Sequence, residues 1–243
     1  MEIVVLDYGS GNVRSAVRAL EKVGSALDSH EVSIRLTADR AAAVAADGLV
    51  VPGVGAFAAC MAGLGRVDAA GILAERLADA RPVLGICVGM QVLFADGIEH
   101  GVHTDGLGLL PGRVQPLRAP VVPHMGWNTV TPPAGSVLFE GIEPGTRFYF
   151  VHSYAVPAPD PASPYLATLT EHGDRFVAAA EHGVLSATQF HPEKSGAAGQ
   201  ALLRNWIRSV AARLAGPHPP QASPPARSHP ASNENIPAEQ GES

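Results

Sequence analysis

Four apolar runs in the first 90 residues alternate with segments of helical periodicity, and this alternation limits the folds open to the chain. The runs are rich in Val, Ile and Leu and cover residues 2–8, 32–36, 48–51 and 82–86. Helical patterns lie between them, from Val13 to a stop at Gly24, over 39–46 and over 67–80, and a short helix is expected to follow Cys87 through Phe94. Strands that are apolar on both faces are typical of parallel sheets covered by helices on each side. We therefore expect an α/β fold with a mostly parallel central sheet and helices on both faces.

The second half of the chain has a different texture. After Gly106, Pro, Gly and short β-type runs dominate, at residues 113–117, 148–156, 165–170, 176–181 and 184–189. The Glu-His-Gly step at 181–183 indicates a hairpin between the last two runs. An amphipathic segment at 195–214 is expected to close the body as a helix. We therefore expect the second half to be rich in antiparallel strands.

Composition excludes several classes of protein. Of the 243 residues, 46% are hydrophobic and 16% are charged, so the chain can bury a large core. The net charge is -6, whereas nucleic-acid binding needs clustered Lys and Arg. No apolar run approaches the roughly 20 residues of a membrane span, and two cysteines cannot form a disulfide framework. We therefore expect a cytoplasmic protein that binds neither nucleic acid nor membrane.

A change in composition near the C-terminal end predicts a domain boundary. Seven of the 21 prolines lie in residues 217–243, which contain no aromatic residue and one large aliphatic residue, Ile236. Such a segment buries too little apolar area to offset the entropy lost on ordering. We expect one domain over residues 1–215 and a disordered, Pro-rich tail over residues 216–243.

A cysteine flanked by glycines stands where the fourth apolar run meets a helix. The segment Gly-Ile-Cys-Val-Gly at 85–89 is typical of a sharp elbow that lifts a nucleophile above the edge of a sheet. A helix N-terminus beside the thiol favours the thiolate and offers N–H groups to an oxyanion. A buried structural role is the alternative for Cys87, but the elbow favours a nucleophile. Cys60 lacks such a context and is expected to pack in the core.

A thiol nucleophile requires a base and a group that orients the base. His191 follows a strand-like run, and the sequence His-Pro-Glu places Glu193 two residues on, where an extended segment brings both side chains to one face. His100 and His103 form an H-x-x-H pair, but nearby ligands to complete a zinc site are lacking. We expect no metal and no cofactor.

The elbow and the His-Pro-Glu segment occur with four further motifs. In chain order the six are DYGSGN (7–12), PGVGAF (52–57), GICVGMQ (85–91), PHMGWN (123–128), YFVHSY (149–154) and ATQFHPEKS (187–195). The set resembles the class I (triad) glutamine amidotransferases, and within them the glutaminase subunits of imidazole glycerol phosphate synthases, which act in L-histidine biosynthesis. The resemblance covers about residues 2–210. It implies the fold of that family and hydrolysis of L-glutamine to glutamate and ammonia.

The resemblance also implies roles for individual residues. Cys87 would attack the side-chain amide of glutamine, His191 would act as base and then protonate ammonia, and Glu193 would orient His191. The backbone N–H of Val88 would be one oxyanion donor. The second would come from the strand near Val54 and Gly55 once that strand reorients. Positions that line the glutamine pocket are matched by Gly53, Gln91, Ser153 and Tyr154.

The ammonia needs an acceptor on another chain. This sequence has no Gly-x-x-x-x-Gly-Lys-[Ser/Thr] phosphate loop and no second catalytic domain. The resemblance implies a heterodimer with a (β/α)8-barrel cyclase, which makes imidazole glycerol phosphate and an aminoimidazole carboxamide ribotide. Family positions near that interface are matched by Asn12, His124, Trp127, Asn128, Tyr149 and Lys194.

Three alternatives stay open at this point. The chain could be the glutaminase subunit of another ammonia-channelling enzyme such as a pyridoxal phosphate synthase, although the Pro-Gly-Val-Gly and His-Met-Gly-Trp-Asn segments argue against it. A stand-alone cysteine γ-glutamyl hydrolase would share the elbow and would need no partner. A non-catalytic binding module is disfavoured because Cys87, His191 and Glu193 are all present.

Overall fold

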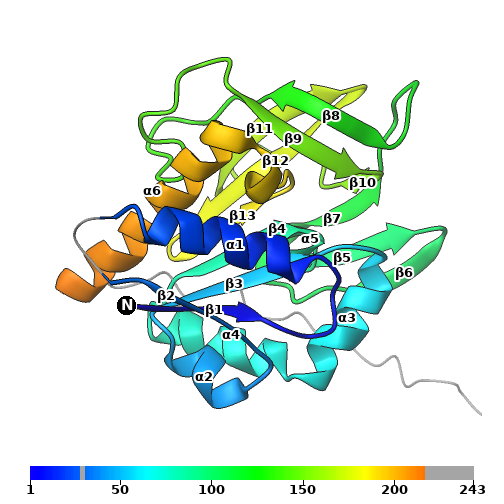
Figure 1. Cartoon of the computed structure of the whole chain (residues 1–243). Coiled ribbons are helices and arrows are strands. Elements are labelled where there is room, and N and C mark those ends of the chain that lie inside the picture. Colours follow the sequence, from blue (N-terminus) through cyan, green and yellow to red (C-terminus); the bar gives the residue numbers. More distant parts are fainter. Residues whose placement is uncertain (28–30, 217–243) are drawn as a thin grey trace, which may run out of the picture.

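The fold is built around one large mixed sheet. Within residues 1–27 and 31–216, which the computed structural model describes, this sheet has seven strands in the order β11-β12-β13-β4-β3-β1-β2 (Figure 1). Five neighbours pair in parallel: β2 (Ser33–Thr37), β1 (Glu2–Leu6), β3 (Gly48–Gly53), β4 (Val83–Cys87) and β13 (Leu185–Thr188). The strands β12 (Asp174–His182) and β11 (Leu166–His172) extend the sheet as antiparallel neighbours.

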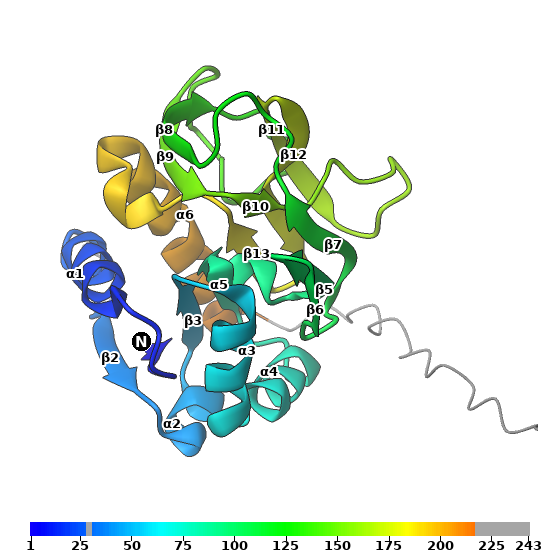
Figure 2. The same cartoon turned by 90° about the vertical axis from the view of Figure 1, so that its right-hand side faces the viewer.

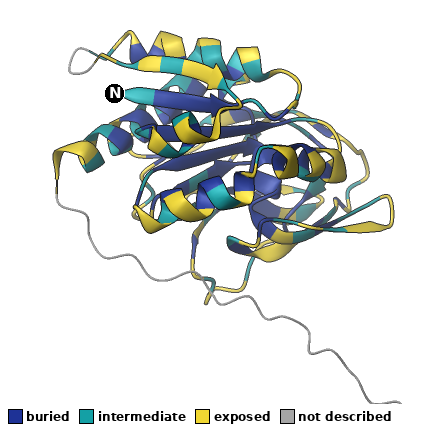
Figure 3. Cartoon of the chain, turned by 90° about the horizontal axis from the view of Figure 1, so that it is seen from below, coloured by how far each residue is buried: buried dark blue, intermediate teal, exposed yellow. Residues whose placement is uncertain are grey.

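Helices cover both faces of this sheet, as its continuously apolar strands require. Helices α1 (Val13–Gly24) and α6 (Gly196–Ala215) lie on one face, and α2 (Arg40–Ala45), α3 (Phe57–Arg66) and α4 (Ala69–Ala78) lie on the other (Figure 1). The central strands β1, β3 and β4 are buried, whereas the edge strand β2 and the outer faces of the helices are largely exposed (Figure 3). The predicted α/β fold with an antiparallel second half is confirmed.

Two smaller sheets are formed by segments between Phe94 and Ala155. One has the strand order β10-β7-β5-β6 and is formed by β5 (Phe94–Glu99), β6 (Val102–Asp105), β7 (Leu110–Pro116) and β10 (Tyr154–Ala155). The other is the antiparallel pair of β8 (His124–Thr129) and β9 (Arg147–His152). The first sheet contacts α5 (Val88–Gln91) through β5, and Figure 2 shows α5 between β13 and β5. The second contacts η1 (Pro192–Lys194) through β9. These two short elements follow β4 and β13.

Several predicted elements differ from the structure. The helix expected over 67–80 is present as α4, which starts only at Ala69, because Asp68 adopts a left-handed conformation and its side chain caps the helix. The helix expected to reach Phe94 ends at Gln91, and the chain turns at once into β5. The run 148–156 is split at Ser153 into β9 and β10. Strands β5, β6 and β8 and helix α3 were not expected.

Two further expectations concern the Pro-rich tail and membrane-spanning segments. The predicted Pro-rich tail begins at Gly216, and residues 217–243 lie outside the described residues. Within the described part, no single helix is long and apolar enough to cross a membrane. Helices α3 and α4 together have the length and apolar composition of a membrane span, but the pair is bent by 76° at the break between them.

Candidate active site

The cysteine elbow has the strained geometry that its glycines suggest. Cys87 ends β4 with φ 57° and ψ -114°, a backbone conformation that residues other than glycine rarely adopt. A Cβ placed on Gly89 would lie 1.9 Å from the carbonyl oxygen of Val51, so only glycine fits where the elbow presses against β3. As the first residue of α5, Val88 has an N–H without an intrahelical partner. The elbow therefore presents a thiol at the start of a helix, next to a backbone N–H that has no partner within that helix.

The imidazole and the carboxylate form a buried pair. His191 Nδ1 and Glu193 Oε1 are 2.7 Å apart, and both side chains are almost fully buried. The His191 backbone N–H donates to the carbonyl of Tyr149 at 2.9 Å, and the Ser195 hydroxyl donates to the carbonyl of His191 at 2.7 Å. The second carboxylate oxygen of Glu193, Oε2, is buried with no hydrogen-bond partner among the described residues. The negative charge is thus directed at the imidazole.

The pKa of His191 is raised to about 9. Burial alone would lower this pKa, but interactions with the Cys87 sulfur and the Glu193 carboxylate outweigh it. A raised pKa makes the ring a stronger base for a thiol proton and keeps it able to donate that proton later.

A cavity of about 370 Å³ opens onto the elbow. Its lining includes most of the residues that the motifs predicted: Val54, Gly55, Cys87, Val88, Gln91, Ser153, Tyr154, His191 and Lys194. Gly53 and Glu193 are not in the lining, but each adjoins a residue that is, Cys87 and His191 respectively. Gly53 pairs with Cys87 across the sheet, where a Cβ would meet the Gly89 nitrogen at 2.3 Å. A volume of this size suits a small ligand such as an amino acid.

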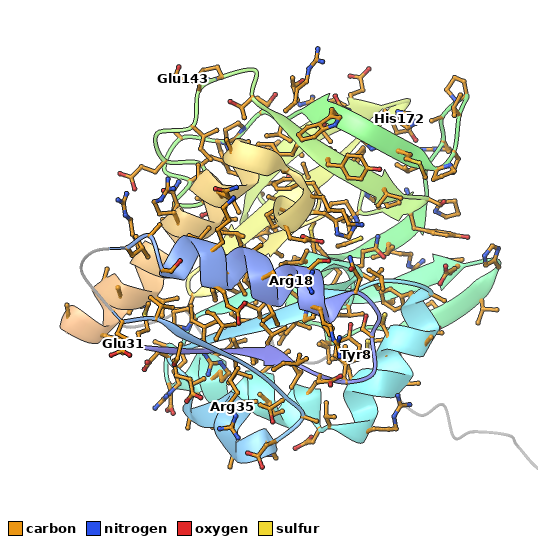
Figure 4. All side chains as sticks on the ribbon, in the orientation of Figure 1. Tyr8, Arg18, Glu31, Arg35, Glu143 and His172 are labelled. Atoms are coloured by element: carbon orange, nitrogen blue, oxygen red, sulfur yellow. The ribbon has the colours of Figure 1, made fainter. Side chains whose placement is uncertain are left out.

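The strand segment 52–55 is held by side chains from two neighbouring elements. The backbone N–H of Val54 donates to the Ser10 hydroxyl at 3.0 Å, so it is engaged outside the cavity. The Tyr8 hydroxyl donates to the Pro52 carbonyl at 2.5 Å, and burial raises the Tyr8 pKa, which keeps this donor protonated. The Cys60 thiol lies 3.5 Å from the Val54 carbonyl. Figure 4 shows Tyr8 where β1 gives way to α1.

Two polar side chains in the site, Gln189 and Glu99, were not predicted from the sequence. Gln91 Nε2 donates to the Tyr154 carbonyl at 2.9 Å and to Gln189 Oε1 at 3.0 Å, and Gln189 Nε2 lies 3.8 Å from Cys87 Sγ. Glu99 lines the cavity, and its Oε2 accepts from the Phe57 N–H at 2.7 Å. The Gln189 side chain could have been suspected from its place two residues before His191.

The predicted interface residues occupy different depths. Trp127 is 53% exposed, with the edge of its ring against Tyr149 at a centroid separation of 5.9 Å. Asn12 and Lys194 are exposed, and Asn128 is half-buried. His124 is only 4% exposed, so any part it plays at an interface is indirect.

The described residues hold no group of three His, Cys, Asp or Glu side chains that could bind a metal ion. His103 lies 3.5 Å from Asp96, and His100 sits in the turn of the β5–β6 hairpin with a positive φ. His103 therefore has a partner within the hairpin, whereas the His100 ring packs against Tyr154 of β10, with ring centroids 5.9 Å apart.

Comparisons with known proteins agree with this geometry. Residues 4–210 match the family described as glutamine amidotransferase class-I. Imidazole glycerol phosphate synthase subunit HisH from Nocardia farcinica is 60% identical over 214 residues, which cover 86% of this chain and 98% of that protein. The subunit of the same name from Streptomyces avermitilis is 58% identical over 215 residues, covering 86% and 97%.

Solved structures share the fold at much lower identity. A glutamine amidotransferase matches with a TM-score of 0.65 at 16% identity, covering 86% of this chain and 98% of that one. The glutaminase domain of Trypanosoma brucei CTPS, with bound acivicin, matches with a TM-score of 0.63 at 17% identity, covering 87% and 93%. The chain therefore belongs to the class I glutamine amidotransferases, in the family of the imidazole glycerol phosphate synthase HisH subunits.

Proposed function

We propose that this chain is the glutaminase subunit of an imidazole glycerol phosphate synthase. It hydrolyses L-glutamine to glutamate and passes the ammonia to a (β/α)8 cyclase subunit, which forms imidazole glycerol phosphate and an aminoimidazole carboxamide ribotide in L-histidine biosynthesis. The observation that carries this proposal is the juxtaposition of a strained Cys87 with the buried His191–Glu193 pair at one cavity. Two free thiols and a biosynthetic role suit a cytoplasmic location.

The chemistry follows from these three side chains. The Cys87 sulfur attacks the side-chain amide carbon of glutamine, and His191 takes the thiol proton. His191 then gives a proton to the departing nitrogen, which leaves as ammonia, and a thioester remains on the sulfur. Water, deprotonated by His191, attacks the thioester and releases glutamate. Glu193 holds the imidazole ring and stabilises its charge at each step.

The tetrahedral intermediate needs two donors for its oxyanion. The N–H of Val88 supplies one at the start of α5. The second is the N–H of Val54 or Gly55, and the Val54 N–H must first leave the Ser10 hydroxyl. Gly55 has a φ of 93°, which lets the segment reorient at low cost. The free subunit is therefore expected to be a poor glutaminase.

The cavity has charges that match a zwitterionic substrate. Glu99 and Lys194 both line it, so a carboxylate is available for the α-ammonium group of glutamine and an ammonium for its α-carboxylate. Gln91 adds an amide whose two Nε2 hydrogens are already used within the protein, which leaves its Oε1 as the group that could accept from a ligand. These groups favour an amino acid over a neutral amide.

The proposed partner surface adjoins the cavity mouth. Strand β8 pairs with β9, β9 contacts η1, and η1 contacts α1, so the elements that carry Trp127, Tyr149, Lys194 and Asn12 are successive neighbours. Lys194 belongs both to this surface and to the cavity lining. A cyclase bound there would cover the route by which ammonia leaves.

Replacement of the nucleophile tests the proposal directly. In complex with the cognate cyclase, Cys87→Ala is expected to lower glutamine-dependent product formation by a factor on the order of 10³ or more, because no thioester forms. Product formation driven by ammonium salt should stay at the parent level, since the cyclase is untouched. Glutamine-dependent synthesis that survives Cys87→Ala would refute the assignment.

A further inference from the structure

A chain of hydrogen bonds runs from β8 to the substrate cavity through two buried histidines. Asn128 Nδ2 lies 3.3 Å from His124 Nε2, and His124 Nδ1 lies 3.0 Å from His152 Nε2. His152 Nδ1 lies 2.9 Å from the carbonyl oxygen of Tyr154. The two histidines are 4% and 7% exposed, and the mechanism above uses neither.

The groups at the two ends of this series of hydrogen bonds determine which atom donates in each bond. The Tyr154 carbonyl can only accept, so His152 carries its proton on Nδ1 and its Nε2 accepts. His124 must then donate from Nδ1 to His152 and accept at Nε2. That agrees with the other end, where Asn128 Oδ1 accepts from the Thr129 N–H and leaves Nδ2 as the donor. One tautomer of each ring satisfies every bond.

The surroundings of the two rings preserve that arrangement. Burial lowers the pKa of His124 to about 4 and that of His152 to about 3, so both rings are neutral at working pH. His172, at the end of β11, stacks on His124 with ring centroids 4.2 Å apart, and Figure 4 shows it beside β8. The His172 Nε2 is 2.7 Å from the Val121 carbonyl, so this ring packs against His124 but is not part of the hydrogen-bond series.

The series of hydrogen bonds ends at groups that shape the glutamine pocket. The Tyr154 carbonyl accepts from both His152 and Gln91. Gln91 in turn bonds Gln189, whose Nε2 lies near the Cys87 sulfur. Because these contacts orient the Gln91 amide, the way in which this lining residue meets a ligand depends on where the Tyr154 carbonyl is held.

We propose that His124 and His152 are positioning residues for glutamine: they hold the Tyr154 carbonyl and the Gln91 amide in the binding geometry and tie both to β8. The inference rests on the proposed function. The two histidines would affect substrate binding through the groups they hold, and neither would touch the reacting atoms.

Conservative variants separate hydrogen bonding from packing. In the ligand-activated complex with the cyclase, His152→Gln removes the donor at the δ position, and its KM for glutamine is expected to rise roughly ten-fold, with a smaller change in kcat. His152→Asn keeps a δ donor for the Tyr154 carbonyl and should stay within about three-fold of the parent KM. The packing control is His172→Asn, which should leave KM within about two-fold.

Three readouts make the result decisive. The parent complex is assayed first, and the absence of glutamine-dependent synthesis there would defeat the proposed function rather than the positioning role. Ammonium-driven synthesis reports folding and assembly of each variant. An unchanged KM in His152→Gln, or equal increases in His152→Gln, His152→Asn and His172→Asn, would overturn the inference.

A second pair of variants applies the same test if His152→Gln fails to assemble. His124→Asn keeps the δ donor to His152, whereas His124→Gln loses it. The inference predicts a higher KM for His124→Gln than for His124→Asn. Equal KM values for the two would overturn it.

Discussion

His191 shows how two neighbours can reverse the effect of burial on one side chain. An imidazole that is only 2% exposed would ordinarily lose its proton easily. Here the Cys87 sulfur and the Glu193 carboxylate stabilise the charged ring, and the pKa rises to about 9. The same ring can therefore accept the thiol proton and return it to ammonia.

The pH dependence of glutamine hydrolysis should report this raised pKa. Above about pH 9 the ring loses the proton that ammonia needs, so kcat of the ligand-activated complex is expected to fall there. Glu193→Gln removes a group that raises the pKa, so the fall should begin at lower pH. The rate at neutral pH should drop by a factor on the order of 10².

Glutamate release measured across the range from about pH 6 to pH 10 checks both expectations. A falling limb at the same pH in the parent and in Glu193→Gln would contradict the role given to the carboxylate.

At the scale of elements, the segment 52–55 is the part of the site most restrained by its neighbours. The loop after β1 supplies Tyr8 and Ser10, and α3 supplies Cys60, so three side chains contact two backbone positions of the segment. Under the proposed function, this segment must move to offer a second oxyanion donor. These contacts therefore favour the less active arrangement.

Loss of the Ser10 hydroxyl should weaken that restraint. In Ser10→Ala the Val54 N–H loses its partner, so we expect glutamate release by the complex without nucleotide ligand to rise several-fold, as one hydrogen bond allows. The ligand-activated rate should change by less than about two-fold. The matched control is Ser25→Ala at the far end of α1, where the hydroxyl donates to Lys22. Equal basal rates in Ser10→Ala and Ser25→Ala would contradict the restraint.

Two glycines in neighbouring elements should respond to alanine in opposite ways. Gly65 lies in α3, where an added Cβ meets nothing within 4 Å, so Gly65→Ala should stabilise the fold by about 0.5–1 kcal/mol. At Gly89 the Cβ would lie 1.9 Å from the Val51 carbonyl oxygen, and Gly89→Ala should destabilise by about 3 kcal/mol or more. The free energy of unfolding in urea measures both. A Gly89→Ala protein as stable as the parent would show that the elbow is not packed as described.

Elements with a clear apolar pattern were the ones that the sequence predicted well. The strands β1, β3 and β4 are buried along their length, as their continuous apolar runs indicated. Helix α3 was missed because small residues and two glycines obscure its buried stripe of Phe57, Cys60 and Leu64. Strand β8 has no clear alternation, and it exists through its pairing with β9, which residue order alone does not show.

The same distinction applies to the site. Motifs indicated Cys87, His191 and Glu193, and the structure brings these three side chains together. Gln189 reaches Cys87 across a separation of 102 residues, so its role depends on the parallel pairing of β13 with β4. Glu99 enters the cavity because β5 turns back beneath α3, a path set by tertiary packing.

At the scale of the whole molecule, the cavity and the exposed face around it form one functional region. Lys194 lines the cavity, Trp127 lies on β8 next to β9, whose Val151 and His152 line it, and the buried His124–His152 pair connects β8 with the pocket. A partner seated on this face would touch both the exit for ammonia and one end of that connection. The proposed function therefore predicts that partner binding and glutamine turnover are coupled.

Glutamate release from glutamine by this chain in three states tests that coupling most directly: alone, with the cognate cyclase, and with the cyclase plus its nucleotide ligand. The account predicts little release by the chain alone and a large rise in the ternary mixture, because the Val54 N–H must leave Ser10 before the oxyanion site is complete. Equal release in all three states would contradict it and would indicate a stand-alone cysteine hydrolase.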